Sequence, residues 1–332
     1  MMQNARASIE IFEKEGTHPQ TVFGYRATTL DNYTDAWMIR NAFYDGNESA
    51  LQKCLHVYYY GYTGPQEKNV CESVIDYLKG IGEYERASYI EYWHGYLIFL
   101  KPLLCLFDYG DIREILKFIT LLLVFYLCVL LERKNMARFI PAFAAAMICV
   151  EFHNAGMSMQ YVSVFLIAMI FSALILKENS AAMDLSKAGL FFLVIGMCTS
   201  YFDFLTYPVF TLGIPLLFWV LCMSKARPDA NLPVLVIRNG IYWAVGYVGM
   251  WAQKWILYTI ITGENLIAIA IRTVIYRSGG EAMGEQRGYF ETAFRNINVL
   301  CKYPYVLAVL AAIIFLLLVN RQENPAGSKK HY

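Results

Sequence analysis

Few residues in this sequence carry a charge, and neither sign is in excess. Charged residues make up 17% of the 332 positions, and the formal net charge is +1. Such a chain has no overall field that would attract nucleic acid, and Lys329 and Lys330 alone are too few to form a basic patch. We therefore expect no nucleic-acid partner.

Short motifs that are typical of soluble enzymes are also missing. The sequence contains no glycine-rich phosphate loop, no zinc-protease helix and no nucleophile elbow. It has eight cysteines but neither a Cys-x-x-Cys pair nor a cysteine–histidine cluster, so a zinc site has little support. A disulfide between Cys54 and Cys71 is left open, because the sequence does not give their distance.

Apolar residues are abundant instead. Hydrophobic residues account for 57% of the chain and aromatic residues for 16%, which is too much for a soluble fold of this length. Since a spanning helix needs about 20 apolar residues, we predict an all-α, polytopic membrane protein with about seven spans. The predicted spans are Ile115–Leu131, Phe139–Val150, Met157–Leu176, Ala188–Tyr201, Leu205–Met223, Ile241–Ile261 and Tyr305–Val319.

The segment Tyr92–Phe107 is a weaker candidate. It is short, and Lys101 and Pro102 would bring a charge and a kink into a spanning helix. Two of the predicted spans, Phe139–Val150 and Ala188–Tyr201, are short as well. We expect interfacial residues or neighbouring helices to shield their ends.

Basic residues gather in the connections at one end of the predicted bundle. Positively charged short loops mark the cytoplasmic side of a membrane protein. With seven spans, this face receives Arg133, Lys134, Arg138, Lys225, Arg227, Arg238, Arg321, Lys329 and Lys330. The opposite, outer face receives a turn at residues 151–158 and a long loop at residues 263–304. We expect a multi-pass protein of a bacterial plasma membrane.

Residues 1–91 form a polar region with enough apolar side chains to pack against a bilayer. We expect this outer-face region to precede a transmembrane domain of residues 92–323 and a cytoplasmic tail of residues 324–332. No apolar segment upstream could thread the region across the membrane, so we expect that a first spanning helix is lacking. The alternative is that Tyr92–Phe107 crosses and residues 1–91 are cytoplasmic.

Asp31 and Asp35 are the first candidate catalytic residues. Residues Thr29–Ala36 indicate a helix start, and acids four residues apart share one helix face. Two such carboxylates could divide general-base and orienting roles, or hold a divalent cation, which is the one cofactor left open. The alternative is structural, with Asp31 capping the helix and Asp35 favoured by its dipole.

Four other ionisable residues lie in or beside apolar runs, where charges are costly and so often functional. Glu151 and His153 follow one run, Asp203 interrupts another, and Lys254 lies within a third. For Asp203, a role as a helix cap is as well supported as a role in a site. The Lys254 side chain could extend to the membrane interface, or it could meet an anionic lipid headgroup. The outer loop adds three candidates for phosphate binding, each equally a solvated charge: Arg272, Arg277 and Arg287.

The order of features over residues 31–176 resembles that of multi-spanning glycosyltransferases of the GT-C type. Those enzymes place a catalytic aspartate in the first outer loop, followed by a histidine-led apolar stretch and a small acidic turn. Here Asp31 or Asp35 takes the first place, residues 92–97 (YWHGYL) with His94 the second, and residues 108–113 (DYGDIR) the third. The segments LDNYTDA, YWHGYLIFLKPLL and YFDFLTYPVFTLGIPL are similar to bacterial membrane proteins near the lipopolysaccharide-type glucosyl transferases.

The resemblance implies an inverting transfer of a sugar from a polyprenyl-phosphate lipid to a cell-envelope acceptor at the outer face. An outer-loop aspartate would deprotonate the acceptor hydroxyl, and Lys254 with the outer arginines would steady the lipid phosphate. Glu151 would mark a second acidic site. Two features depart from the family pattern, because Gly95 and Tyr96 replace the usual proline pair after the histidine, and the first span is lacking.

Two other functions are left open. A transporter or lipid flippase would bind its substrate at mid-membrane depth near Asp203, where prolines interrupt the helices. A non-catalytic membrane scaffold would instead present a flat apolar patch. The enzyme hypothesis requires Asp31 or Asp35 to share one cleft at the membrane surface with Glu151 and the arginine-bearing outer loop.

Overall fold

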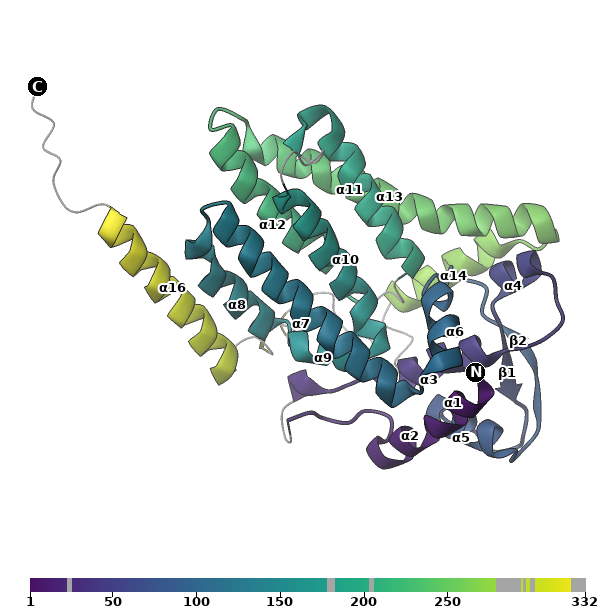
Figure 1. Cartoon of the computed structure of the whole chain (residues 1–332). Coiled ribbons are helices and arrows are strands. Elements are labelled where there is room, and N and C mark those ends of the chain that lie inside the picture. Colours follow the sequence, from purple (N-terminus) through teal and green to yellow (C-terminus); the bar gives the residue numbers. More distant parts are fainter. Residues whose placement is uncertain are drawn as a thin grey trace, which may run out of the picture.

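Helices dominate the computed structural model of the chain (Figure 1). The structure describes residues 1–22, 26–177, 183–202, 206–278, 294, 297–298 and 302–323. Within these ranges, the β-structure consists of one two-stranded antiparallel sheet and one isolated bridge. The predicted helical class is therefore confirmed.

Four of the described helices are long and apolar enough to cross a membrane. They are α7 (Tyr109–Arg133), α10 (Met159–Leu176), α11 (Leu185–Phe202) and α12 (Val209–Ala226). Helix α10 packs against the other three, so these helices form one bundle (Figure 1). The architecture is that of a helical membrane protein, but the predicted number of seven spans is not confirmed.

The remaining predicted spans coincide with helices of other lengths. Helix α8 (Ile140–Cys149) has ten residues, which corresponds to about 15 Å, or roughly half the hydrocarbon thickness of a bilayer. Helix α13 (Leu232–Thr262) has 31 residues and is rich in tryptophan, tyrosine and glycine, which lowers its hydropathy. Helix α16 (Tyr303–Glu323) has 21 residues and contains the apolar stretch Tyr305–Leu318.

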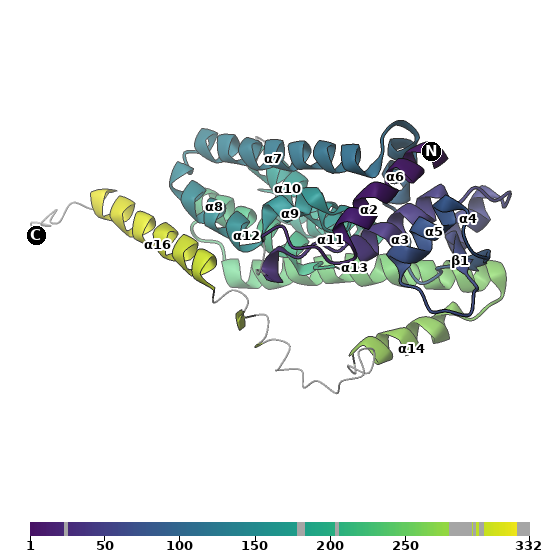
Figure 2. The ribbon, with the colours of Figure 1, turned by 90° about the horizontal axis from the view of Figure 1, so that it is seen from below.

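Large apolar side chains cover the outer surface of the bundle. On α7, Phe118 is 62% exposed and Phe125 is 66% exposed, and α13 and α16 carry further exposed isoleucine and leucine side chains. An apolar belt of this extent is unfavourable in water and matches a lipid surrounding. The opposite faces of the helices enclose a core around Phe165, Phe192 and Trp219. Figure 2 shows α7 and α13 on opposite sides of this bundle.

Glycine residues allow α11 and α13 to approach each other closely. A Cβ atom at Gly196 of α11 would lie 2.0 Å from the backbone oxygen of Trp243. A Cβ atom at Gly246 of α13 would lie 2.1 Å from the backbone oxygen of Leu193. Small residues at helix contacts are the usual means by which membrane helices pack closely. The close packing of α11 against α13 thus requires glycine at these two positions.

The N-terminal region consists of short elements at one end of the bundle (Figure 1). Its elements are α1 (Met2–Ala7), α2 (Ile9–Glu15), the 3₁₀ helix η1 (Arg26–Thr28), α3 (Asn32–Phe43), α4 (Ala50–His56), β1 (Tyr58–Tyr62), α5 (Val70–Lys79) and β2 (Tyr84–Ser88). Helices α4 and α5 begin at capping boxes headed by Ser49 and Asn69, which satisfy their first backbone N–H groups. Strands β1 and β2 are antiparallel, and Tyr60 pairs with Arg86.

The core of the N-terminal region continues into the bundle. Phe43 of α3 belongs to the same buried cluster as Tyr109 and Ile112 of α7 and Met159 of α10. The region is therefore packed on the bundle rather than joined to it by a linker alone. Cys54 and Cys71 are both free thiols, so the disulfide that the sequence left open is not formed.

The doubtful segment at residues 92–107 yields a short helix, α6 (Leu97–Leu106), with Pro102 inside it. Ten residues reach only about 15 Å, so α6 is too short to cross a bilayer by itself. The residues before it lie against the bundle, because Gly95 N–H donates to the Tyr201 carbonyl at 2.9 Å and Trp93 Nε1 donates to the Met250 carbonyl at 2.7 Å.

Replacing Gly196 by alanine is expected to lower the melting temperature of the protein in detergent micelles, since the new Cβ would overlap the Trp243 carbonyl. Overpacking of this kind costs about 1–3 kcal/mol of unfolding free energy. Gly249→Ala in α13 is the matched control, because no atom lies within 4 Å of a Cβ at that position. Equal melting temperatures for the two variants would contradict the close approach of α11 and α13.

Candidate functional site

Asp35 connects the N-terminal region to a spanning helix. Its side chain is fully buried, and both carboxylate oxygens accept hydrogen bonds. Oδ2 accepts from the Tyr109 hydroxyl at 2.5 Å and from Met159 N–H at 2.9 Å, while Oδ1 accepts from the Ser158 hydroxyl at 3.1 Å and from Gln160 N–H at 2.9 Å. Asp35 thus caps the N-terminus of α10 from a different part of the chain.

Two opposing effects act on the pKa of the Asp35 carboxyl. Burial raises the pKa of its carboxyl to about 6, although the four hydrogen bonds oppose the rise. The N-terminus of α10 carries the positive end of the helix dipole, which favours a carboxylate there. Because the side chain is fully buried and both oxygens are engaged, the structure places Asp35 where it supports α10 and not where a substrate binds.

A second set of contacts surrounds this cap. Arg113 Nη1 donates to both carboxylate oxygens of Glu15, at 3.0 and 2.9 Å, and the Asn32 amide donates to the same carboxylate at 3.1 Å. The Arg113 guanidinium lies 5.1 Å from the ring centroid of Tyr109, which itself bonds Asp35. The acidic turn at residues 108–113 therefore helps to hold α2 and α3 against α7.

Lys254 makes the complementary contact at the other side of the N-terminal region. It is fully buried, and its ammonium donates to the backbone oxygens of Cys54 at 2.9 Å and Leu55 at 2.6 Å. These carbonyls belong to the last turn of α4, where the negative end of the helix dipole favours a cation. The structure thus gives Lys254 a contact within the protein, rather than one with lipid phosphate.

His94 lies among aromatic rings. It is 3% exposed, and its ring centroid is 4.8 Å from Tyr89, 6.1 Å from Tyr92 and 5.8 Å from Tyr96. Its backbone has a φ of 54°, a left-handed conformation that is uncommon for a residue other than glycine. The histidine-led segment is therefore a packed connection between β2 and α6.

The other predicted site residues are distributed as follows. Arg272 is exposed on α14 (Leu266–Ser278), a helix that packs against α13, and Arg277 lies in the same helix. Arg287 and Asp203 lie outside the described residues, as does most of the arginine-bearing loop. The structure therefore does not place these arginines beside Asp31 or Glu151.

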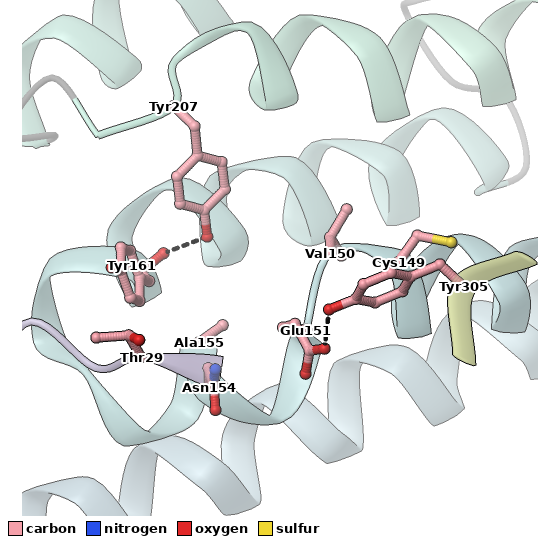
Figure 3. Close-up of a pocket in the computed structure, with 9 residues that line it drawn as sticks. All are labelled: Thr29, Cys149, Val150, Glu151, Asn154, Ala155, Tyr161, Tyr207 and Tyr305. Atoms are coloured by element: carbon pink, nitrogen blue, oxygen red, sulfur yellow. Dashed lines mark hydrogen bonds between the residues drawn. The ribbon is translucent and has the colours of Figure 1, made fainter. Parts of the chain in front are cut away.

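A cavity of about 300 Å³ lies where the N-terminal region meets the ends of the spanning helices (Figure 3). It is lined by Thr29, Cys149, Val150, Glu151, Asn154, Ala155, Tyr161, Tyr207 and Tyr305. These residues come from the segment after η1, from α8, from α9 (Phe152–Met157), from α10, from the segment before α12 and from α16. The volume is at the lower limit of about 300–1,000 Å³ that is usual for ligand pockets.

Glu151 and His153 form the polar centre of this site. The Glu151 carboxylate accepts a hydrogen bond from the Tyr305 hydroxyl, and its Oε2 is 3.2 Å from His153 Nδ1. His153 Nε2 lies 3.3 Å from the hydroxyl of Thr21, which also donates to the Asn154 side-chain oxygen at 3.1 Å. The site thus combines a carboxylate, an imidazole, an amide and hydroxyls.

The backbone of Glu151 is strained. Its φ of 51° and ψ of 51° place it in the left-handed region, which favours glycine. Strain at a residue other than glycine costs about 1–3 kcal/mol and occurs often at functional sites. In this chain, the conformation turns the Glu151 side chain toward Tyr305 between α8 and α9 (Figure 3).

Asp31 is close to this cavity. It caps α3, accepting from Thr34 N–H at 3.1 Å and from the Thr34 hydroxyl at 2.8 Å, and its side chain remains 22% exposed. Thr29, two residues earlier, lines the cavity, and the charge of Asp31 acts on Tyr161, which also lines it. Of the two predicted aspartates, Asp31 is therefore the one that stays partly accessible.

Sequence reasoning identified Glu151 and His153 but missed most of their surroundings. Thr21, Thr29, Asn154, Tyr161, Tyr207 and Tyr305 come from widely separated segments, and no spacing in the sequence links them. Among the described residues, no group of three or more histidine, cysteine, aspartate or glutamate side chains could hold a metal ion. A divalent cation therefore has no observed ligand set in this part of the chain.

The chain was compared with protein families, curated proteins and solved structures. No family model, curated protein or solved structure matches the chain. The resemblance to GT-C glycosyltransferases therefore rests on the residues of this chain alone.

Asp35→Asn is expected to lower the melting temperature in detergent micelles, because an amide has one acceptor oxygen where the carboxylate has two. Each buried donor left without a partner costs about 1–3 kcal/mol. Asp108→Asn is the matched control, since Asp108 caps α7 locally and asparagine caps as well as aspartate. Equal losses in both variants would contradict the role of Asp35 as a buried cap of α10.

The pH dependence of this contribution has a defined sign. Because the pKa of Asp35 rises from its ordinary 3.8 to about 6, the folded protein binds this proton more tightly than the unfolded chain. The contribution of this pKa difference to the unfolding free energy is fully present below about pH 4 and is lost as the pH rises through about 6. The difference in unfolding free energy between wild type and the non-titrating Asp35→Asn should therefore narrow from pH 4 to pH 7. Denaturant titrations at several pH values measure it, and a widening gap would contradict the rise in the pKa of Asp35 on burial.

Proposed function

We propose that this chain transfers a sugar from a polyprenyl-phosphate lipid to a hydroxyl of a cell-envelope acceptor at the outer face of the membrane. The observation that carries the proposal is Glu151, which lines a cavity at the ends of the apolar helices and whose carboxylate contacts the neighbouring His153. Such a pair can accept a proton from a hydroxyl group. The order of features that resembles GT-C enzymes supports the same reaction.

The surroundings of the cavity suit a donor that is attached to a lipid. Tyr305 stands at the beginning of the apolar part of α16, whose Leu307 and Leu310 are exposed, and Ile148 of the neighbouring α8 is 45% exposed. A polyprenyl chain could lie along these apolar surfaces while the phosphate and sugar enter the polar cavity. A freely soluble donor would make no use of this placement.

The reaction can be written with the residues in place. Glu151 takes the proton of the acceptor hydroxyl, and the oxygen forms a bond to the anomeric carbon of the sugar. The bond from that carbon to the phosphate oxygen breaks, and the electron pair stays on the polyprenyl phosphate. A single displacement inverts the configuration at the anomeric carbon. His153 orients the Glu151 carboxylate, and the amide of Asn154, which lines the cavity, offers a donor to the departing phosphate.

This proposal changes the catalytic assignment that the sequence suggested. Asp31 or Asp35 was expected to be the base, but Asp35 is fully buried in its contacts with α10. We assign the base role to Glu151, which lines the cavity, and give Asp31 no step in the reaction, since it caps α3. Lys254 is bonded to the end of α4 and has no part in the proposed reaction.

Glu151→Gln is expected to lower the rate of sugar transfer about 100-fold or more, since a general base contributes about 10²–10⁴ to the rate. Glutamine keeps an oxygen that accepts from Tyr305, so the fold should persist. The measurement uses the full chain in liposomes, polyprenyl-phosphate hexoses labelled in the sugar, and a cell-envelope extract as acceptor. Sugar transfer is measured as the amount of labelled sugar that leaves the lipid fraction.

Glu114→Gln provides the control, because Glu114 is an exposed carboxylate in the early part of α7, paired with Lys117. Its rate should equal that of wild type. Transfer that is equal in Glu151→Gln and wild type would refute Glu151 as the base. If wild type transfers no label from glucosyl, galactosyl or mannosyl donors, the proposed function itself is rejected.

A further inference from the structure

A second cavity, of about 200 Å³, lies at the opposite end of the bundle from Glu151. It is lined by Lys134, Met136, Ile175, Met183, Cys222, Lys225 and Ala226. Lys134 and Met136 follow the end of α7, and Ile175 lies at the end of α10. Met183 precedes α11, and the other three residues lie in the last turns of α12. Since α7, α10 and α12 begin near the first cavity and end here, the second cavity belongs to the face predicted to be cytoplasmic.

Two lysines stand at the rim of this cavity. The Lys225 ammonium donates to the backbone oxygen of Lys134 at 2.9 Å, which brings the two residues together. Among the described residues, neither lysine has an ion pair with an acidic side chain. Asp184, the nearest acid in sequence to Met183, bonds Ser186 and pairs with Lys187 at 3.6 Å. The rim is thus cationic.

The inside of the cavity is apolar. Met136 is 4% exposed and Ile175 is 1% exposed, and Met183 and Cys222 complete the lining. Methionine side chains are flexible and adapt to irregular apolar ligands. A cationic rim above an apolar interior matches a ligand with an anionic head and a hydrocarbon chain. Its position at the ends of apolar helices corresponds to the depth of lipid headgroups.

We propose that this cavity binds an anionic phospholipid of the inner leaflet. The phosphate lies between the Lys134 and Lys225 ammonium groups, and the first part of an acyl chain contacts Met136, Ile175 and Met183. Basic pockets between membrane helices on the cytoplasmic side are a common form of lipid site. The bound lipid would hold together the ends of α7, α10 and α12. This site is separate from the proposed transfer reaction.

The test is a titration of the purified full chain in detergent with dioleoyl phosphatidylglycerol or dioleoyl phosphatidylcholine, followed by melting temperature. Phosphatidylglycerol should raise the melting temperature at lower concentration than phosphatidylcholine does. Lys134→Gln with Lys225→Gln should weaken the apparent affinity for phosphatidylglycerol about thirtyfold, at about 1 kcal/mol per lysine. Lys177→Gln with Arg227→Gln is the control, because both residues are exposed at the same end and neither lines the cavity.

Three outcomes would overturn the proposal. The first is an equal loss of affinity in the control double variant, which would show a general charge effect. The second is equal stabilisation by the two phospholipids in wild type. The third is equal stabilisation by glycerol 3-phosphate, which would show a free phosphate site without an acyl chain. If the double variant does not fold, Lys225→Gln serves instead, since Lys225 is exposed, and a loss of about fivefold is expected.

Discussion

The contact between Asp35 and the N-terminus of α10 is the constraint on which the arrangement depends. It joins residues that are more than 120 positions apart, because Asp35 bonds the backbone N–H groups of Met159 and Gln160. Lys254 makes the matching contact with the end of α4. Each buried charge is compensated by a helix end of opposite partial charge, which avoids the large cost of an unpaired ion. The N-terminal region is therefore held on the bundle at two places.

These two attachments also define the candidate site. With α3 fixed on α10, the segment before α3 brings Thr29 over the turn that contains Glu151 and His153. Tyr305 then closes the cavity from α16. The strain at Glu151 is maintained by contacts on both sides, with Tyr305 and with His153. The residues that position the site are thus distinct from those that line it.

The sequence predicted the helical membrane class because long apolar runs have few alternative structures. It also singled out Glu151 and His153, since ionisable residues beside apolar runs are rare, and Asp31, since it lies four residues before Asp35 at a helix start. It could not show that Asp35 caps a distant helix, because a cap across the chain leaves no local spacing pattern. The predicted number of spans is not confirmed, since apolar segments such as α8 form helices too short to cross a bilayer by themselves. The tyrosines of the cavity were missed because aromatic residues are common throughout this chain.

The account requires the N-terminal region and the Lys134–Lys225 rim to lie on opposite sides of the membrane. The direct measurement uses single cysteines, Glu67→Cys and Glu132→Cys, in a background without other cysteines, since both positions are exposed. Intact cells are treated with an impermeant thiol reagent. We predict labelling at position 67 in intact cells and at position 132 only after permeabilisation. Labelling of both positions from the same side, or of position 132 alone in intact cells, would contradict the account.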